Sequence, residues 1–510
     1  MNPKPATPKD AASVILLNQN LNKVLWAQRN PKLKFLGGFH SFPGGKVDPD
    51  DDSVKVDNCD DRETARLIAC AAREVFEEIG VLLARGGERL TKGQRASLHD
   101  DLISGRFTFS EILETWGLSI DADDFTYTDC WTTPEFSPLR FKTRFFLAVC
   151  PPKQKPYAAI DELRNIEFIE PAQAIELWRR SKALMAPPAL QSLRRLVRSK
   201  DPETDLLSKD LPATDQSENA KIDHIELNSR LICLPLRTKT LPPATHTNCF
   251  IVGKREFVVI DAASKETPEQ AKLFALLDKL IEGGGRCRAI IVSHLHPDHF
   301  GGETVLREHL RSKHQTDPPI SAHRLTAESL RGKVEIEKFI EDQEIFALRD
   351  ENGSAFDLKA LHTPGHARGH LCFYDEEYGF LLSSDNVVGL GSVLIAPPEG
   401  NMSDYLRSLE KMRDLPGLNF LCGSHGPAIS EAKGKIEEYI FHRLERERQI
   451  IEAVESGAQT PEEVARAVYQ NLDPQLFSLA VESVRAHLAK ISQEGYFKSD
   501  STKSVRYSNL

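Results

Sequence analysis

Apolar and polar residues alternate along this chain in two long series, and each series predicts an α/β domain. From about residue 11 to residue 197, strand-like runs such as SVILLN and TRFFLAV alternate with stretches of helical spacing. A second series over about residues 225–432 contains RLICLPL, FVVIDA, RAIIVSH, FLLSSD and LNFLCGS. Its helical stretch TPEQAKLFALLDKLIEGGG ends in glycines, which favour helix termination.

A polar segment separates the two series. Residues 198–222, RSKDPETDLLSKDLPATDQSENAKI, are charged and poor in aromatic residues, as is typical of an exposed linker. Beyond residue 432, three stretches with i, i+3 and i+4 apolar spacing precede a strand-like tail, YFKSDSTKSVRYSN, and this pattern indicates a winged helix. We therefore expect a first domain over 1–197, a linker over 198–222, a second domain over 223–432 and a winged helix over 433–510.

Composition narrows the class of protein. A chain of 510 residues exceeds what one hydrophobic core supports, and 40% hydrophobic with 27% charged residues is typical of globular domains. The net charge of -10 disfavours binding of nucleic acid through the overall charge of the protein. We expect a cytoplasmic protein without membrane contact, because the sequence has no secretory segment or membrane span and its nine cysteines form no CxxC pair. The oligomeric state stays open.

Four metal-ligand side chains stand within six residues directly after a predicted strand. They are His294, His296, Asp298 and His299 in AIIVSHLHPDHFGG. Loops at the carboxyl ends of strands carry the chemistry of open α/β sheets, and imidazole and carboxylate groups are ligands that zinc prefers. Four such groups cannot all be buried without a partner, so the cluster predicts a metal site.

Three further polar residues follow apolar runs downstream: His366 in LHTPGHARGH, Asp385 in FLLSSDN and His425 in FLCGSHGP. Their order and placement resemble the metallo-β-lactamase superfamily. The resemblance implies an αββα sandwich and a hydrolase with two Zn2+ ions. It assigns one ion to His294, His296 and His366, the other to Asp298, His299 and His425, Asp385 as the bridge, and Asp298 also as a catalytic residue.

The second domain is similar to one branch of that superfamily. THTNCFIVG, HTPGHARGHLCFY and CGSHGPAISEAKGKIEEYIFHRLERERQI, followed by a winged helix, resemble the lactamase-β-2-like branch, which includes single-strand endoribonucleases and thioester hydrolases. Two positions depart from its pattern: Ser384 replaces a glycine, and Gly423-Ser424 replaces Pro-Gly. Outside the ligand set, Asp261, His362 and His370 are expected to orient ligands or to serve the structure.

The first domain carries an acidic helix. In AREVFEEIG, Glu74, Glu77 and Glu78 lie at i, i+3 and i+4, and stacked carboxylates of this kind favour a hard divalent cation. With the preceding FPGG, the segment resembles the Nudix box. The resemblance implies that the three glutamates bind Mg2+ or Mn2+, that Glu77 and Glu78 are catalytic, and that Arg73 braces the loop.

This Nudix box departs from the family pattern upstream of the helix. The glutamate expected eight residues before Arg73 is Ala65, and an insertion, DDDSVKVDNCDDRET, separates the glycines from the helix; Glu63 is a candidate substitute. The inserted box, CWTTPEFSPLRFKTRFFLAV and MAPPALQSL together resemble the peroxisomal coenzyme A diphosphatase type of Nudix protein.

These patterns predict an α/β and α+β multidomain enzyme with a Nudix fold, a metallo-β-lactamase sandwich and a winged helix. The preferred interpretation is hydrolysis of an acyl-CoA-like thioester by the second domain and of a diphosphate such as coenzyme A by the first. One alternative is an endoribonuclease acting on single-stranded RNA, with a degenerate or regulatory Nudix domain. Another is a nucleotide-sensing regulator that binds DNA.

The winged helix is expected to pack rather than to bind DNA. Its basic residues are Lys490, Lys498, Lys503 and Arg506, but its helices are rich in glutamate, which repels phosphates. The run HRLERERQ predicts a solvated helix with i, i+4 ion pairs.

Overall fold

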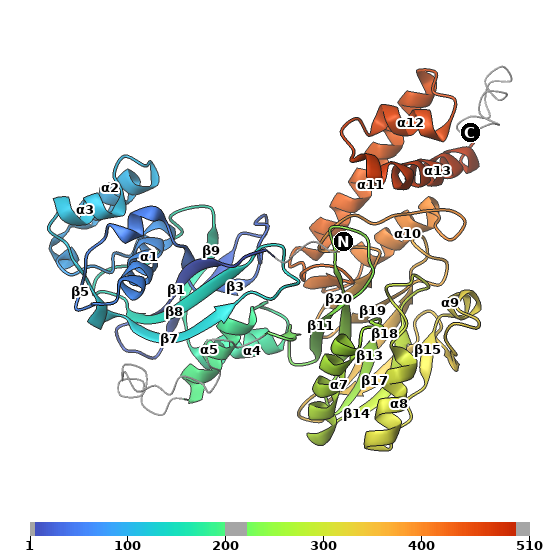
Figure 1. Ribbon diagram of the computed structural model, residues 1–510, viewed down its shortest axis with the longest axis horizontal. Helices are drawn as coiled ribbons and strands as arrows, with labels where there is room; N and C mark the ends of the chain where they lie inside the picture. Colours follow the sequence, from blue (N-terminus) through green and yellow to red (C-terminus); the bar gives the residue numbers. More distant parts are fainter. Residues whose placement is uncertain (1–5, 199–221, 496–510) are drawn as a thin grey trace. The chain divides into compact units, whose positions relative to one another are not determined.

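A computed structural model describes residues 6–198 and 222–495 of the chain (Figure 1). It divides into two compact units, Met1–Asn228 and Ser229–Leu510. Within the described ranges, no helix combines the length and the hydropathy that crossing a bilayer requires. The strand-like tail after residue 495 and most of the expected linker lie outside the described residues.

The first unit is built on a mixed sheet with strand order β3-β2-β1-β8-β7, with β4 beside β1 and β9 beside β2. β1 and β8 are parallel, whereas the other pairs are antiparallel. The strands are β1 (Lys9–Leu17), β2 (Val24–Arg29), β3 (His40–Ser41), β4 (Gly44–Lys46), β7 (Thr126–Thr132), β8 (Phe141–Val149) and β9 (Leu163–Ile169).

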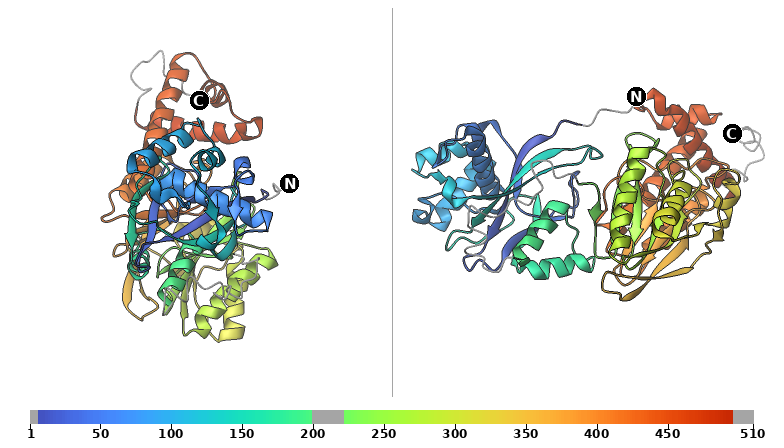
Figure 2. Two further views of the ribbon diagram at one scale, coloured as in Figure 1. Left: turned by 90° about the vertical axis from the view of Figure 1, so that its left-hand side faces the viewer. Right: turned by 60° about the horizontal axis from the view of Figure 1, so that its bottom comes forward.

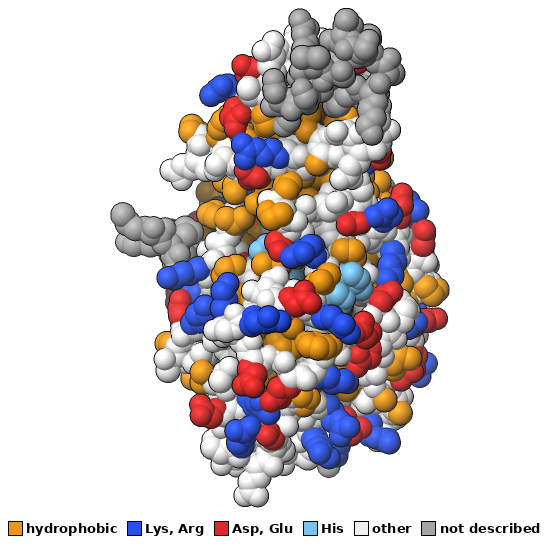
Figure 3. Space-filling model, turned by 90° about the vertical axis from the view of Figure 1, so that its right-hand side faces the viewer, with side chains coloured by type: hydrophobic (Ala, Val, Ile, Leu, Met, Phe, Trp, Pro, Cys, Tyr) orange, Lys and Arg blue, Asp and Glu red, His pale blue; other side chains and the backbone are white. Residues whose placement is uncertain are grey.

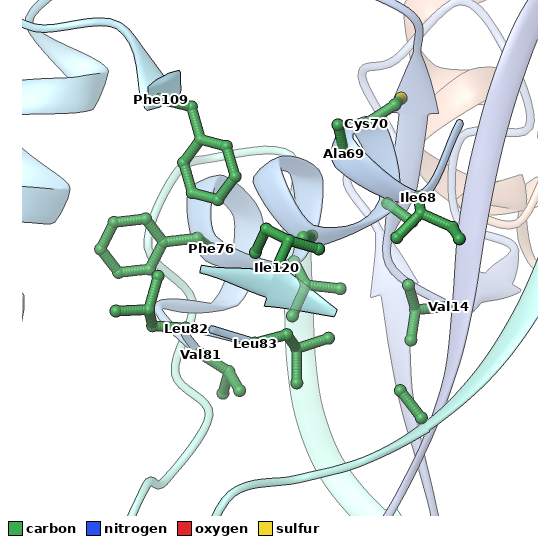
Figure 4. Packing of buried hydrophobic residues seen from close by; sticks show 14 of the residues in the cluster. Val14, Ile68, Ala69, Cys70, Phe76, Val81, Leu82, Leu83, Phe109 and Ile120 are labelled. Carbon is green, nitrogen blue, oxygen red and sulfur yellow. The ribbon is translucent and has the colours of Figure 1, made fainter. Parts of the chain in front are cut away.

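Helix α1 (Arg62–Ile79) covers one face of this sheet. Asp61 caps it by accepting a hydrogen bond from the Thr64 amide, and Gly80 ends it with a φ of 66°. Ile68 and Phe76 on the helix, Val14 on β1, and Phe109 and Ile120 beyond it belong to one buried cluster (Figure 4). On the other face, α4 (Pro171–Arg179) and α5 (Pro187–Arg198) bury Trp178, Leu190 and Leu193 against the sheet.

The insertion in the acidic-helix motif is an ordered part of this unit. It forms the 3-10 turn η1 (Pro49–Asp52) and the strand β5 (Val56–Asp57), which pairs with β6 (Ile120–Asp121). Val54 and Val56 are buried in the same core as α1. The helices α2 (Lys92–Ile103) and α3 (Phe109–Thr115) follow, and the Ser110 hydroxyl on α3 donates to Asp50 at 2.6 Å.

The second unit contains two sets of strands joined where β13 meets β17. Strand order is β11-β12-β13-β14-β15-β16 in the first set and β17-β18-β19-β20-β21 in the second. The strands are β11 (Leu231–Arg237), β12 (His246–Val252), β13 (Glu256–Ile260), β14 (Arg286–Val292), β15 (Ile320–Ala322), β16 (Lys338–Phe339), β17 (Ile345–Arg349), β18 (Ala355–His362), β19 (Leu371–Asp375), β20 (Phe380–Ser384) and β21 (Phe420–Gly423).

Helices cover both outer faces of these sheets, which gives the expected αββα order. α7 (Thr267–Glu282) and α8 (Glu303–His314) pack leucines against β12, β13 and β14, and they lie side by side on one face in Figures 1 and 2. α10 (Met402–Arg413) and the start of α11 (Ala432–Glu455) pack on β18, β19 and β20. Alternate strand residues, among them Phe250, Val258 and Phe373, are buried as well, as sheets covered on both faces require. The short helix α9 (Arg324–Ser329) follows β15.

The helices of the expected winged helix are present. α11 continues past the sandwich and packs Ile450 and Val454 against α12 (Pro461–Val468) and α13 (Phe477–Gln493). The prediction for HRLERERQ is only partly right. Arg448 forms solvated pairs with Glu445 and Glu452, but Arg446 lies over the Tyr469 ring, and Glu447 contacts Lys490 on α13 at 2.8 Å, because this stretch faces other helices on one side.

Candidate functional site

The seven predicted ligands of the second unit converge at one edge of the sandwich. His294, His296, Asp298 and His299 follow β14, and His366 lies between β18 and β19. Asp385 and His425 follow β20 and β21. Their ligand atoms form two groups, each within 4.8 Å: one of His294, His296, His366 and Asp385, and one of Asp298, His299 and His425.

The Asp385 carboxylate lies between the two groups. Its Oδ2 is 3.5 Å from His366 Nε2 and 3.4 Å from His299 Nε2, while its Oδ1 is 3.5 Å from His425 Nε2. Asp298 Oδ2 is also 3.5 Å from His425 Nε2. Neighbouring ligands of a tetrahedral ion, each about 2.0–2.1 Å from it, lie about 3.3 Å apart. These separations therefore suit ligands that share an ion.

The ring orientations also suit metal binding. His366 Nδ1 donates to the Leu394 carbonyl at 2.8 Å, and His425 Nδ1 donates to the His246 carbonyl at 2.9 Å. His299 Nδ1 contacts Asp261 Oδ2 at 2.9 Å. A proton fixed on Nδ1 leaves the Nε2 lone pair for a metal, which is the usual arrangement of ligating histidines.

Three buried atoms at this centre have no hydrogen-bond partner among the described residues: His299 Nε2, His366 Nε2 and Asp385 Oδ1. Unpartnered buried polar atoms are costly and rare, and here all three belong to predicted ligands. A pair of divalent cations would satisfy them. The donor set, imidazole and carboxylate, also fits zinc.

The histidines of the centre differ in their protonation behaviour. Burial lowers the pKa of His296 to about 3, so this imidazole is neutral and able to ligate. Burial opposes ionisation of Asp385, but His299 and His425 outweigh it and hold the pKa of this carboxyl well below its usual value. Burial also opposes the charge of His425, whose pKa Asp385 and Asp298 nevertheless raise to about 10.

A serine network lies beneath the ligands. Ser384 Oγ donates to Ser293 Oγ at 2.8 Å and lies 3.2 Å from Ser424 Oγ, while Ser293 Oγ donates to Asp261 at 2.7 Å. Ser384 has a φ of 44°, in the left-handed region that favours glycine. The two departures from the family pattern, Ser384 and Ser424, are thus in contact, and they join the hydrogen bonds that orient His299.

Two other histidines differ in their relation to the centre. His370 Nδ1 contacts Thr363 Oγ1 at 3.0 Å, and its Nε2 accepts a hydrogen bond from the Asp385 amide at 3.2 Å, so it holds the Asp385 loop. His362 instead stacks on His323 with ring centroids 4.1 Å apart and contacts no predicted ligand side chain among the described residues.

Asp278, His309 and His314 form a further group of close donors, between α7 and α8. Both imidazoles contact Asp278 Oδ1, at 2.8 and 2.6 Å, and Lys313 Nζ donates a hydrogen bond to Asp278 Oδ2 at 2.8 Å. Because the ligand atoms already satisfy one another, this group is an ion-pair network that ties the two helices.

In the first unit, the glutamates of α1 gather around Arg73 and the glycine loop. Arg73 Nη1 donates to Glu74 and Glu77 at 3.0 and 2.9 Å, and Glu78 Oε2 accepts from the Gly44 amide at 2.8 Å. A Cβ on Gly45 would lie 2.4 Å from Glu74 Oε1, so a larger residue there would displace this carboxylate. Among the described residues, the three carboxylates do not form a single group as close as the histidine centre.

Burial raises the pKa of two glutamates on α1. Burial, only partly offset by Arg73, raises the pKa of Glu74 to about 7. Burial and the neighbouring Glu74 raise the pKa of Glu78 well above its usual value. A divalent cation beside these carboxylates would favour their ionised forms.

The proposed substitute Glu63 does not reach this site. Its carboxylate pairs with Arg144 at 2.6 Å, because residue 63 stands at the other end of α1. Arg73 is instead held by Asp51, a residue of the insertion that sequence reasoning missed, at 2.8 and 3.0 Å. The only signal in the sequence is the aspartate run at 50–52, which has no fixed spacing to Arg73.

Three family models match the chain in separate segments. The NUDIX domain matches residues 7–106, the Metallo-beta-lactamase superfamily matches residues 242–425, and the Beta-lactamase associated winged helix domain matches residues 460–504. The chain joins these three domains in that order. It is therefore an enzyme, a metallo-β-lactamase-fold hydrolase that also carries a Nudix domain.

Curated relatives match about half of the chain. A Beta-lactamase-like protein 2 homolog of Caenorhabditis elegans is 26% identical over 49% of this chain and 79% of its own length. An Atrochrysone carboxyl ACP thioesterase of Aspergillus chevalieri is 29% identical over 46% of this chain and 72% of its own length. A Putative nudix hydrolase 7 of Caenorhabditis elegans is 29% identical over 51% of this chain and 77% of its own length.

Proposed function

We propose that the metallo-β-lactamase domain hydrolyses a thioester of the acyl-CoA type, and that the Nudix domain hydrolyses a diphosphate such as that of coenzyme A. The catalytic units are residues 1–197 and 223–432, with the winged helix over 433–510. The observation that carries the proposal is that His299 Nε2 and His366 Nε2, both buried and without a hydrogen-bond partner among the described residues, lie 3.4 and 3.5 Å from the Asp385 carboxylate.

The residues of the centre have separate roles in this proposal. His294, His296 and His366 would hold one Zn2+ ion and Asp298, His299 and His425 the second, with the Asp385 carboxylate between the two groups. Bound zinc supplies Lewis acidity, which polarises a carbonyl oxygen and lowers the pKa of water. Asp298 would orient the attacking water at this centre, because its carboxylate is fixed 3.9 Å from His299 Nε2 and 3.5 Å from His425 Nε2.

A thioester is preferred to RNA for two reasons. A relative of the same domain is named as an acyl-carrier-protein thioesterase. Two basic side chains of the winged helix are also paired with glutamates: Lys490 with Glu447, and Arg485 with Glu462. Lys and Arg are interspersed with Asp and Glu over the face in Figure 3, whereas a long polyanion requires many unpaired cations.

A direct rate comparison tests this choice. The purified chain is assayed on acyl-CoAs, on an acyl-carrier-protein thioester and on labelled single-stranded RNA at moderate salt, beside His296→Ala and the surface control His442→Ala. We expect thioester hydrolysis that His296→Ala abolishes and His442→Ala leaves unchanged. RNA cleavage that only His296→Ala abolishes, without thioesterase activity, would establish the ribonuclease alternative.

The Nudix proposal rests on the Arg73 and Gly44 contacts with the three glutamates. Glu74, Glu77 and Glu78 hold Mg2+ or Mn2+, and Glu77 and Glu78 act in catalysis. A diphosphatase and a thioesterase in one chain would share the coenzyme A group. The assay is release of adenosine bisphosphate from coenzyme A with Mg2+ or Mn2+, compared with nucleoside diphosphate derivatives. Absence of release from every substrate would favour a degenerate Nudix domain.

We also propose a cytoplasmic location. All nine cysteines are free thiols, and eight of them are buried. Reducing compartments keep thiols in this state. A labelled protein found in an oxidising compartment would contradict this assignment.

A further inference from the structure

We propose that Arg443 on α11 is a positioning residue of the metal centre. It fixes the backbone carbonyl of Val393, and the neighbouring carbonyl of Leu394 orients the ring of His366. This role makes the helices that follow the sandwich part of the hydrolase rather than a separate module. The inference rests on the proposed metal-dependent function of this centre.

The Leu394 carbonyl belongs to residues 385–401, a segment between β20 and α10 that forms neither a helix nor a strand. Backbone hydrogen bonds hold the start of this segment, where the Gly389 and Leu390 amides donate to the His425 carbonyl at 2.7 and 3.1 Å. Leu394 lies further along, where no regular structure fixes the direction of a carbonyl. That direction therefore depends on contacts with neighbouring elements.

Arg443 supplies one such contact. Its Nη2 donates a hydrogen bond to the Val393 carbonyl, and its guanidinium lies over the Tyr405 ring of α10, 5.4 Å from the ring centroid. The Val393 carbonyl belongs to the planar peptide group that precedes Leu394. After Leu394, the Ile395 side chain is buried in the cluster of α10 and α11. The chain is therefore fixed on both sides of the carbonyl that orients His366.

Two tyrosines hold the start of the same segment. Tyr405 Oη donates to the Asn386 carbonyl at 2.7 Å, and Tyr439 Oη donates to the Val388 carbonyl at 3.3 Å. Tyr439 and Arg443 are four residues apart on α11, so they lie on one face of that helix. This face of α11 therefore holds the segment both at its start and at its middle.

The next turn of α11 connects this face to α13. The carboxylate of Glu447, four residues after Arg443, lies 2.8 Å from Lys490 Nζ and 3.4 Å from His487 Nδ1. Ala486 on α13 is also buried in the cluster that contains the α10 side chains. In Figure 1, α11 runs from the sandwich to α12 and α13. Packing of α13 therefore helps to fix the direction in which α11 presents Arg443.

A different role for Arg443 would be to bind an anionic substrate. The residue is only partly exposed, and the observed partners of its guanidinium are a backbone carbonyl and an aromatic ring. Removing a group that only binds substrate raises KM and leaves kcat unchanged. Removing a group that orients a ligand lowers metal affinity and kcat instead. Measurement therefore separates the two roles.

The test measures metal binding and kinetics in the full chain. Zn2+ affinity is measured by competition with a chromophoric chelator, and the absorption spectrum of bound Co2+ reports the geometry of its ligands. The variants are Arg443→Gln, Arg443→Lys and the control Arg448→Gln, which changes an exposed arginine of the same helix. We expect Arg443→Gln to lower the affinity for one of the two ions and thioesterase kcat, each by about 10-fold, to alter the Co2+ spectrum and to change KM little.

The other variants separate positioning from general stability. Arg443→Lys keeps the charge and a donor, so it should recover part of the loss, and Arg448→Gln should match the unmodified chain. In a His366→Ala background, Arg443→Gln should have little further effect on metal affinity, because the ring that it helps to orient is absent. If circular dichroism shows that Arg443→Gln does not fold, Arg443→Lys takes its place, with a smaller loss of the same kind expected.

Unchanged Zn2+ affinity in folded Arg443→Gln, or in Arg443→Lys where the first variant does not fold, would overturn the inference. An equal loss with and without His366 would do the same. A raised KM with unchanged kcat and metal affinity would also overturn it, by assigning Arg443 to substrate binding. Failure of the proposed function is distinct: the unmodified chain would then bind metal in an Arg443-dependent manner but hydrolyse no thioester.

Discussion

Asp261 Oδ2 lies 2.9 Å from Nδ1 of His299, and this contact orients the imidazole from the side opposite Nε2. Asp261 is buried at the end of β13 with a φ of 58°, and its other oxygen accepts from the Ser293 amide. One carboxylate therefore orients both a predicted ligand and the strand end that carries the ligand cluster.

Asp261→Asn should lower the metal affinity of the centre without removing a predicted ligand. An amide at this position no longer stabilises the proton on His299 Nδ1 as a carboxylate does. Mutation of a group that hydrogen-bonds to a ligating histidine typically lowers metal affinity or activity by about 10- to 100-fold. The measurement is metal content by elemental analysis together with kcat/KM for the thioester. Asp350→Asn, in the turn between β17 and β18, is the matched control, and an equal loss there would show a general effect on stability.

Removing a predicted ligand should have a larger effect. We expect the unmodified chain to retain about two transition-metal ions in the centre. Asp298→Ala and His299→Ala should each abolish most of the hydrolase activity while the circular dichroism spectrum stays unchanged. Elemental analysis and activity assays on the same preparations check this. Full activity in both variants without bound metal is the outcome that contradicts the assignment.

The two catalytic domains should be separable by mutation. Glu77→Gln should abolish diphosphatase activity and leave thioester hydrolysis unchanged, because Glu77 belongs to the unit that ends at Asn228, whereas every predicted zinc ligand lies beyond it. Both rates are measured on one preparation. Equal loss of the two activities would show that the domains are not independent.

Glu303 should make stability depend on pH near neutrality. Burial raises its pKa to about 7, and both oxygens accept the Gly301 amide, at 2.9 and 2.8 Å. Because the folded pKa lies above the unfolded value of 4.5, the folded state holds a proton that the unfolded chain releases. The contribution is full below about pH 4.5 and is lost as pH rises through about 7.

Replacing this carboxyl by an amide should remove that dependence. Glu303→Gln should be more stable than the unmodified chain at pH 8, by up to about 3 kcal/mol, and the difference should vanish near pH 5. Unfolding by denaturant at both pH values in zinc-saturated buffer checks this. A constant difference across the range would mean that Glu303 does not titrate there.

The strand runs and helical spacings predicted most of the fold correctly. SVILLN lies in β1, RAIIVSH in β14, and the glycine-terminated helix is α7, which ends at Glu282. The two strands were predictable because they are short continuous apolar runs that are buried on both faces, and α7 because it buries one helical face. The partners of HRLERERQ were not, since Glu447 meets Lys490 only after α13 has folded back on α11.

The side chains of the candidate sites were predictable from the sequence, but the groups that orient them were not. His294 and His299 stand in a dense motif, and the structure brings them together with His425. The backbone carbonyls of Leu394 and His246 orient the rings of His366 and His425. They cannot be recognised in a sequence, because every residue has a backbone carbonyl. Asp51 was missed for a related reason, since a contact across an insertion has no fixed spacing.

The ligands of the metal centre come from the ends of four strands, from His294 after β14 to His425 after β21. An unfolded chain cannot assemble such a set, so free energy released on metal binding adds to the unfolding free energy of this domain. Each tenfold rise in free metal above the dissociation constant contributes about 1.4 kcal/mol per ion. A strong chelator should therefore lower the unfolding temperature of the metallo-β-lactamase domain, which calorimetry on the full chain measures.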